Sequence, residues 1–227
     1  MTPWIAKPVP FNIGQGAAAG SSVVTPDFET DFPNDSLWTE EGTDFNIASN
    51  QANNGGAGNN SDQRLYLTSG LGFTLSNSQW AIRWTYKCTN AGDGVESGVP
   101  IYVSDVVAKP LTSSFDMIGV MQGNGFPLQS AYTNGSGVSG GTESNAITSG
   151  TEYYIQLQRT STTTVTLTIY TDDTFETEFQ SPITQTIPSG VQGLDQLAIS
   201  STDNGSKAAP QSQWYVKSLL VYNNHNF

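Results

Sequence analysis

The sequence has 227 residues, with 8 basic and 20 acidic side chains and a net charge of −12. Only 12% of the residues are charged, against about 25% in an average soluble protein, whereas 82 of the 227 are Ser, Thr, Asn or Gln. Because so few cations cannot form a basic surface, we expect neither nucleic acid nor an anionic membrane as a direct partner.

The residue types that carry most enzyme chemistry are scarce. The single cysteine, Cys88, excludes an intrachain disulfide, and the single histidine, His225, argues against a His-rich metal site and against a triad with an interior histidine. No apolar run approaches the roughly 20 residues of a membrane span, and the N-terminus lacks the apolar segment of a signal peptide. We therefore expect a protein that is not an enzyme, with no membrane insertion and no cleaved leader.

Residues 1–26 are rich in proline and glycine and show neither helical nor strand periodicity. Such a segment frays in an isolated domain unless it packs on something. We predict an extended arm that docks on its own domain or on a neighbouring subunit. Its apolar contacts would be Trp4, Ile5, Phe11 and Ile13.

From residue 27 onward, short runs of strand character are separated by turn clusters. The strictest alternation is at 80–88, where Trp80, Trp84 and Cys88 fall on the apolar face, so we expect them in the core. The clearest hairpin joins 153–158 to 165–170. Further strands are expected at 64–68, 101–107, 117–121, 196–200 and 214–222.

The run 214–222 is apolar on both faces, so we expect both to be covered. Strict alternation would place Trp214, Val216 and Leu220 on one face and Tyr215, Leu219 and Val221 on the other. Turn clusters are expected at 50–62, 90–98, 123–127, 134–141 and 203–210. The pattern predicts an all-β chain in which a two-sheet antiparallel sandwich, residues 27–227, follows the arm at 1–26.

The order of these segments resembles a known family. The opening Asp27–Asp31, followed by Leu37-Trp38-Thr39, is similar to the first strand of concanavalin A-like lectin/glucanase jelly rolls, including laminin-G-like domains of phages and marine microbes. The hairpin at 153–170 and the closing segments 197–200 and 216–223 resemble the late hairpin and last two strands of that group. The resemblance covers roughly residues 27–224 and implies a jelly-roll fold. It does not imply one function, because the group includes lectins, glycoside hydrolases, lyases and virion proteins.

The catalytic glucanases of this group carry paired carboxylates on one face of a strand, and this sequence lacks their motif. The nearest spacing is Asp27, Glu29 and Asp31, in the first strand. We interpret these residues as the charges of an edge strand, which discourage the addition of another strand. A carboxylate site is the alternative.

Calcium is the cofactor that the resemblance suggests. Ca²⁺ takes six to eight oxygen ligands, which loops rich in Asp and Asn can supply. The alternative is that these loops are solvated turns, since Asp and Asn side chains also bond their own backbone. The candidate ligands are Asp93, Asp172, Asp173, Asp203 and Asn204.

Carbohydrate binding would use exposed aromatic rings with polar groups beside them, because the C–H face of a sugar stacks on a ring. Tyr154 and Tyr170 fall on the outward side of the hairpin, and Tyr132 is expected in a loop near Asn134. These four residues are the candidate glycan contacts.

Three functions fit the sequence. The first is a structural or adhesive lectin-like protein on the outside of an assembled particle, such as a capsid decoration, vertex or tail protein of a phage virion, whose arm binds other subunits. The second is a free carbohydrate-binding module or lectin at an extracellular surface. The third, a glycoside hydrolase or polysaccharide lyase, needs a catalytic residue set that we do not find. The sequence favours the first.

Overall fold

The structure, a computed structural model, describes residues 24–33, 36–42, 45–54, 63–90, 98–108, 115–123, 125–201, 213–225 and 227. The arm contacts predicted at Trp4, Ile5, Phe11 and Ile13 lie outside these residues. Within the described part, every regular element is a strand, and no helix is long and apolar enough to cross a membrane. The predicted all-β class is therefore confirmed.

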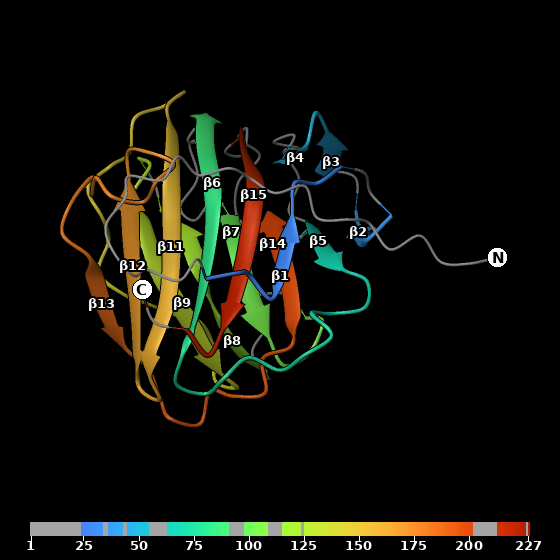
Figure 1. Cartoon of the computed structure of the whole chain (residues 1–227), viewed down its shortest axis with the longest axis vertical. Coiled ribbons are helices and arrows are strands. Elements are labelled where there is room, and N and C mark those ends of the chain that lie inside the picture. Colours follow the sequence, from blue (N-terminus) through green and yellow to red (C-terminus); the bar gives the residue numbers. More distant parts are fainter. Residues whose placement is uncertain are drawn as a thin grey trace.

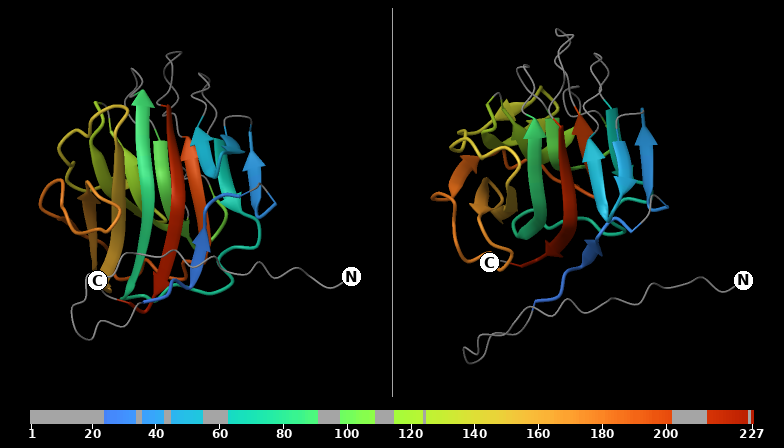
Figure 2. Two further views of the ribbon diagram at one scale, coloured as in Figure 1. Left: turned by 45° about the horizontal axis from the view of Figure 1, so that its top comes forward. Right: turned by 90° about the horizontal axis from the view of Figure 1, so that it is seen from above.

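Two antiparallel sheets pack face to face as a sandwich, which Figure 1 and Figure 2 show from three directions. The eight-stranded sheet has the order β13 (Ile183–Thr186), β12 (Thr164–Tyr170), β11 (Glu152–Ser161), β6 (Trp80–Asn90), β15 (Gln213–Asn223), β4 (Gln51–Asn54) and β3 (Phe45–Ala48), and β1 (Phe28–Thr30) pairs with β15 beside β4. The seven-stranded sheet has the order β10 (Ser139–Gly140), β9 (Leu128–Asn134), β8 (Asp116–Gln122), β7 (Gly98–Ser104), β14 (Gln196–Ser201), β5 (Gln63–Leu67) and β2 (Trp38–Glu41).

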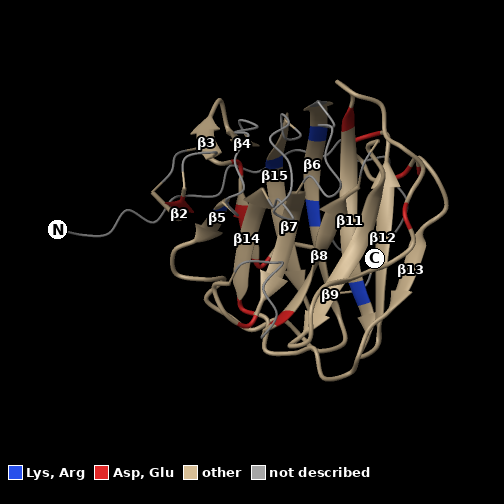
Figure 3. Cartoon of the chain, turned by 180° about the vertical axis from the view of Figure 1, so that it is seen from behind, with Lys and Arg blue, Asp and Glu red and all other residues tan. Residues whose placement is uncertain are grey.

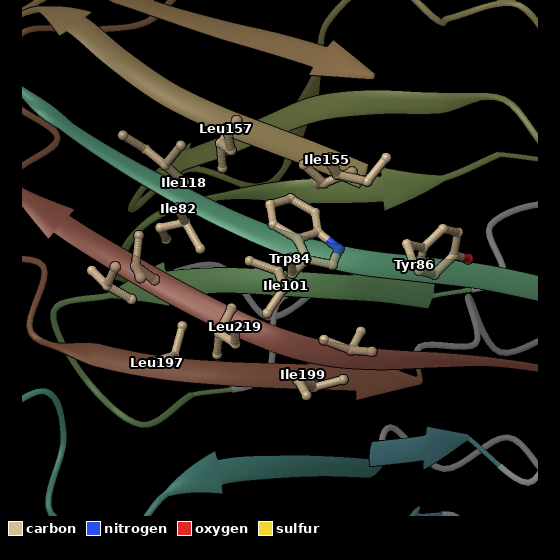
Figure 4. Close-up of a cluster of buried hydrophobic side chains, with 14 of the residues drawn as sticks. Ile82, Trp84, Tyr86, Ile101, Ile118, Ile155, Leu157, Leu197, Ile199 and Leu219 are labelled. Carbon is tan, nitrogen blue, oxygen red and sulfur yellow. The ribbon is translucent and has the colours of Figure 1, made fainter. Parts of the chain in front are cut away.

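The core lies between the sheets and is built by strand alternation. In β6, the inward side chains Trp80, Trp84 and Cys88 are buried, as predicted. Trp84 lies opposite Ile155 of β11, and Figure 4 shows both beside side chains of the other sheet, including Ile101. Since successive side chains of a strand point to opposite faces, the same strands present their polar residues to the outside.

Most of the predicted strands are confirmed within a few residues. The hairpin is formed by β11 and β12, which are joined at Thr162 and Thr163. Several short strands were not predicted, and two polar segments are among them. Gln51–Asn54, expected in a turn cluster, is strand β4, and Leu128–Asn134 is strand β9. Both are rich in Asn, Gln and Ser, which have low intrinsic strand propensity, so their pairing with neighbouring strands overrides the local signal.

The strand β15 corrects the expectation of strict alternation at 214–222. Its register with β6 shifts between Lys217 and Leu220, and Ser218 has a φ of 51°. This irregularity is a β-bulge, and an extra residue of this kind reverses the alternation that follows it. Leu219, rather than Leu220, therefore points inward together with Trp214.

Arg159 is buried completely at the end of β11. Its guanidinium donates hydrogen bonds to the carbonyls of Val191 at 2.8 Å, Thr162 at 2.7 Å and Ser161 at 3.2 Å. Burial lowers the pKa of Arg159 from its ordinary value, against the raising effect of the Asp116 charge. The side chain ties the β11–β12 turn to the loop that precedes β14.

We predict that Arg159→Ala destabilises the fold by roughly 3 kcal/mol, because the substitution leaves a cavity and removes the donors for three carbonyls. The free energy of unfolding, measured by urea denaturation, tests this. The neighbouring Thr160 is exposed, so Thr160→Ala is the control and should change stability by less than about 0.5 kcal/mol. Equal stability of the two variants would contradict the structural role of Arg159.

Candidate functional site

Five half-buried side chains form a group on the outer face of the eight-stranded sheet, which we call the tyrosine–lysine face: Lys87, Glu152, Tyr154, Tyr215 and Lys217. They come from three adjacent strands, β11, β6 and β15. Figure 3 shows basic residues on the neighbouring strands β6 and β15, whereas much of the acidic colour lies on loops and strand ends. No other place in the described chain brings two lysines together, since Lys87 and Lys217 are the two lysines described.

The strand register sets this arrangement. Glu152 of β11 lies opposite Lys87 of β6, which in turn lies opposite Tyr215 of β15. One pleat further along the strands, Tyr154 and Lys217 lie on either side of Thr85. Because paired strands are about 4.8 Å apart and side chains on one face repeat every two residues, the tyrosines and the lysines alternate across the face.

The carboxylate of Glu152, on the β11 side of the face, accepts hydrogen bonds from two of these side chains. The hydroxyl of Tyr215 donates a hydrogen bond to Oε1 of Glu152, and Nζ of Lys217 donates to the same oxygen at 2.8 Å. Burial alone would raise the pKa of Glu152, but these hydrogen bonds and the charges of Lys217 and Lys87 lower it below its ordinary value. Burial and the hydrogen bond to Glu152 raise the pKa of Tyr215, so Tyr215 stays a neutral phenol.

Amide side chains extend the face beyond Tyr215. Asn53 of β4 lies opposite Tyr215, and Asn46 of β3 lies opposite Asn53. The amide nitrogen of Asn53 donates to the carbonyl of Asn46 at 3.1 Å, and its amide oxygen accepts from Gln51 at 2.6 Å. These amides and the two lysines place hydrogen-bonding groups on both sides of the Tyr215 ring.

The other predicted hairpin tyrosine, Tyr170, is packed against a neighbouring ring and is not exposed on the surface. It is 9% exposed, and its ring lies 5.3 Å from that of Phe175, which also approaches Tyr154 at 6.1 Å. The guanidinium carbon of Arg83 lies 4.5 Å from the Phe175 ring and 4.1 Å from the Phe227 ring. The face is therefore bounded on this side by an aromatic cluster around a half-buried arginine.

Tyr132 and Asn134 do not join this face. Tyr132, expected in a loop, lies inside strand β9 of the other sheet and packs against the core from a half-buried position. Asn134 ends the same strand, is exposed, and accepts a hydrogen bond from Ser136 at 2.7 Å. Since Tyr132 belongs to the seven-stranded sheet, the four predicted glycan contacts are divided between the two sheets.

The acidic loop after β12 is a hydrogen-bonded turn. One oxygen of Asp172 accepts from the backbone N–H of Thr174 at 3.1 Å, and the other accepts from Thr177 at 2.7 Å. Hydrogen bonds, with that from the Thr174 hydroxyl first, lower the pKa of Asp172. The carboxylate is thus used by its own turn, which is the alternative that the sequence offered to a calcium site.

The predicted calcium ligands are divided between described and undescribed parts of the chain. The described residues contain no group of three or more His, Cys, Asp or Glu side chains placed to hold a metal ion. Asp172 accepts hydrogen bonds from its own turn. The candidates Asp93, Asp203 and Asn204 lie outside the described part of the chain, and Asp173 stays a prediction.

The carboxylates of the first strand lie at a sheet margin. Within the described residues, β1 pairs with β15 alone. Asp27 accepts a hydrogen bond from the backbone N–H of Asn223 at 2.7 Å, and the N–H of Asp27 donates to the carbonyl of Val221 at 2.8 Å. Asp27 therefore fastens the first strand to the last one, as expected for an edge strand.

The sequence matches no family model and no curated protein, but the structure is similar to several solved ones. Arcelin-5, a lectin-like defence protein from Phaseolus vulgaris, has a TM-score of 0.60 at 13% identity, over 86% of this chain and 96% of that one. The Ca²⁺-bound exoplasmic/lumenal domain of VIP36 has 0.58 at 12%, over 84% and 85%. A carbohydrate esterase from Shiga toxin-encoding bacteriophage phi24B has 0.57 at 15%, over 89% and 100%.

At such low sequence identity, the structural similarity establishes the fold alone. The chain is a concanavalin A-like jelly roll, so the resemblance seen in the sequence is confirmed at the level of fold. The similar structures include lectins and also a carbohydrate esterase and an alginate lyase. Function therefore depends on the side chains that this chain places on the fold.

Tyr215, Lys217, Lys87 and Glu152 were not among the predicted site residues. A local signal existed, because Lys87 falls on the polar side of the alternation at 80–88 and Tyr215 alternates with Trp214. The sequence does not show that β6 pairs with β11 and β15. This pairing brings Glu152 to Tyr215 and Lys217, which are 63 and 65 positions away in the chain.

We predict that the stability gained from Glu152 depends on pH. Its folded-state pKa lies below the ordinary value of 4.5, so the ionised group stabilises the fold above that pH and the contribution is lost as the pH falls through the folded-state pKa. The difference in unfolding free energy between native protein and Glu152→Gln should thus shrink from about pH 6 to about pH 3.

The control for this experiment is Glu176→Gln. Glu176 is exposed, and its backbone N–H rather than its carboxylate contacts Asp172. We expect no such pH-dependent difference for this variant. A Glu152→Gln difference that stays constant over the same pH range would show that the hydrogen bonds do not depend on the carboxylate charge.

Proposed function

We propose that this protein binds carbohydrate at the tyrosine–lysine face and does not transform it. The observation that carries the proposal is the placement of Tyr154 and Tyr215 on β11 and β15, the two strands that flank β6, where both are half-buried with Lys, Glu and Asn side chains beside them. A pyranose ring has apolar C–H faces and a rim of hydroxyl groups. Rings fixed in a sheet with polar groups beside them match both parts of that chemistry.

The chemistry of the face supports binding rather than catalysis. Glycoside hydrolysis generally uses two carboxyl groups, about 5–5.5 Å apart in retaining enzymes, and this face contributes one, Glu152. That carboxylate is held by Tyr215 and Lys217. A catalytic base at Tyr215 would need a lowered pKa, whereas burial and Glu152 raise it.

Proteins of the same fold give the proposal its context. The similar structures include a mannose-bound form of VIP36 and a Bauhinia forficata lectin in complex with GalNAc. At 13% and 8% identity these titles describe those proteins and not this one. They support carbohydrate as a ligand class that this fold accommodates.

We further propose that the protein acts on the outside of an assembled particle, such as a phage virion, where many copies bind together. A ligand lying across an open sheet face buries little surface, so one site should have a dissociation constant on the order of 1 mM, about 4 kcal/mol of binding free energy. Multivalent display can raise the overall affinity by about 10²–10⁴. The arm at 1–26 would join the subunits.

Glycan binding is tested with a matched pair of tyrosine variants. We predict that Tyr215→Ala weakens binding to the glycans recognised on an array by roughly tenfold, about 1.4 kcal/mol, because the ring is removed. Tyr215→Phe keeps the ring and should retain most of the affinity.

The control for glycan binding is Thr166→Ala, on β12 of the same sheet. It should bind as the native protein does. If native protein bound no glycan, or if Tyr215→Ala bound as well as native, the proposed function would be wrong.

The assembly proposal is tested by deleting residues 1–26. We predict a folded domain, because Asp27, which the deletion keeps, holds the first strand to β15 by two hydrogen bonds. Light scattering should show a native oligomer that falls to a monomer in the truncated protein. A monomer in both cases, or an unchanged oligomer after truncation, would contradict the role of the arm.

A further inference from the structure

The basic side chains of the described residues differ in the groups that they contact. The three arginines are held by other groups: Arg64 is paired with Glu41, Arg83 lies against aromatic rings, and Arg159 donates to backbone carbonyls. The two lysines, Lys87 and Lys217, are half-buried and both belong to the tyrosine–lysine face. In a protein with a net charge of −12, this face is where the described chain presents ammonium groups to solvent.

The two lysines are not equivalent. Nζ of Lys217 lies 2.8 Å from Oε1 of Glu152, so its charge is balanced by that carboxylate. Nζ of Lys87 lies 5.8 Å from the centroid of the Tyr215 ring, and no carboxylate of the described residues lies within ion-pair distance of it. Among the described residues, Lys87 therefore has an ammonium group next to the proposed stacking ring and no carboxylate within ion-pair distance, while the charge of Glu152 on the opposite strand acts on it from further away.

Resting on the proposed function, we infer that the ligand is an anionic saccharide, and that the carboxylate of a hexuronate residue pairs with Lys87 while a sugar ring lies on Tyr215. A charged acceptor suits an ammonium group better than a sugar hydroxyl does, because charge-assisted hydrogen bonds are the stronger ones. Among the described residues, Glu152 forms its ion pair with Lys217 and not with Lys87.

Because the protein is acidic overall, we expect an anionic ligand to be attracted only close to Lys87. At an ionic strength of about 0.15 M, charges more than about 8 Å apart in solvent are largely screened. Repulsion from distant acidic groups is then weak, while the contact with Lys87 persists. A short oligouronate should thus bind by this contact, and a long polyanion should gain little from its additional charges.

The test compares two probes that differ at their carboxyl groups, charged in one and esterified in the other: trigalacturonate and its methyl ester, titrated calorimetrically into the full-length protein at that ionic strength. We expect native protein to bind the acid about fivefold more tightly than the ester, roughly 1 kcal/mol, which is the upper range for an exposed ion pair. Lys87→Gln should bind both probes equally. Tyr215→Ala should weaken the binding of both.

Thr184→Glu is the control for net charge. It changes the charge by the same amount as Lys87→Gln, at an exposed position on the edge strand β13, and it should keep the preference for the acid. If native protein bound both probes equally, or if Lys87→Gln kept the preference, the inference would be overturned while glycan binding stood.

A further outcome separates this inference from the proposed function. If native protein bound neither probe, the anionic ligand would be wrong. Binding to neutral glycans that Tyr215→Ala weakens would then leave the proposed function intact. If no glycan bound at all, both would be overturned.

Discussion

The pairing of β6 with β15 decides what the eight-stranded sheet presents to solvent. Both strands run the length of the sandwich, and their inward residues, such as Trp84 and Val216, fill the core. Once this burial fixes the inward set, the residues between them must point outward. Lys87, Tyr215 and Lys217 therefore reach the outer face because the core requires their neighbours to point inward.

The bulge at Ser218 divides β15 into two parts of different character. On the side of Trp214, the outward residues are Tyr215 and Lys217, both half-buried. Beyond the bulge, Leu220 lies opposite Arg83, and the guanidinium of Arg83 lies beside the Tyr222 ring. The bulge thus lies at the boundary between the polar group that we propose to bind sugar and the aromatic cluster that closes the face.

How far the sequence predicts the structure depends on how local each signal is. Trp80–Cys88 and the hairpin at 153–170 were predicted because apolar and polar residues alternate over many positions. The expectation for 214–222 was wrong because no residue type marks the bulge. The segment Gln51–Asn54 is strand because β15 and β3 supply its partners. Of the proposed site, Tyr154 was predicted, whereas Glu152 and Tyr215 depend on contacts between distant strands.

The single cysteine gives this fold an internal reporter. Cys88 follows Lys87 in β6 and points to the opposite side of the strand, where it is buried and accepts a hydrogen bond from the amide of Gln122 at 3.3 Å. A thiol reagent can reach it when this end of β6 separates from the sheet beneath. The rate of thiol labelling therefore measures how often the strand under the tyrosine–lysine face opens, and a ligand that holds β11, β6 and β15 together would slow that exchange.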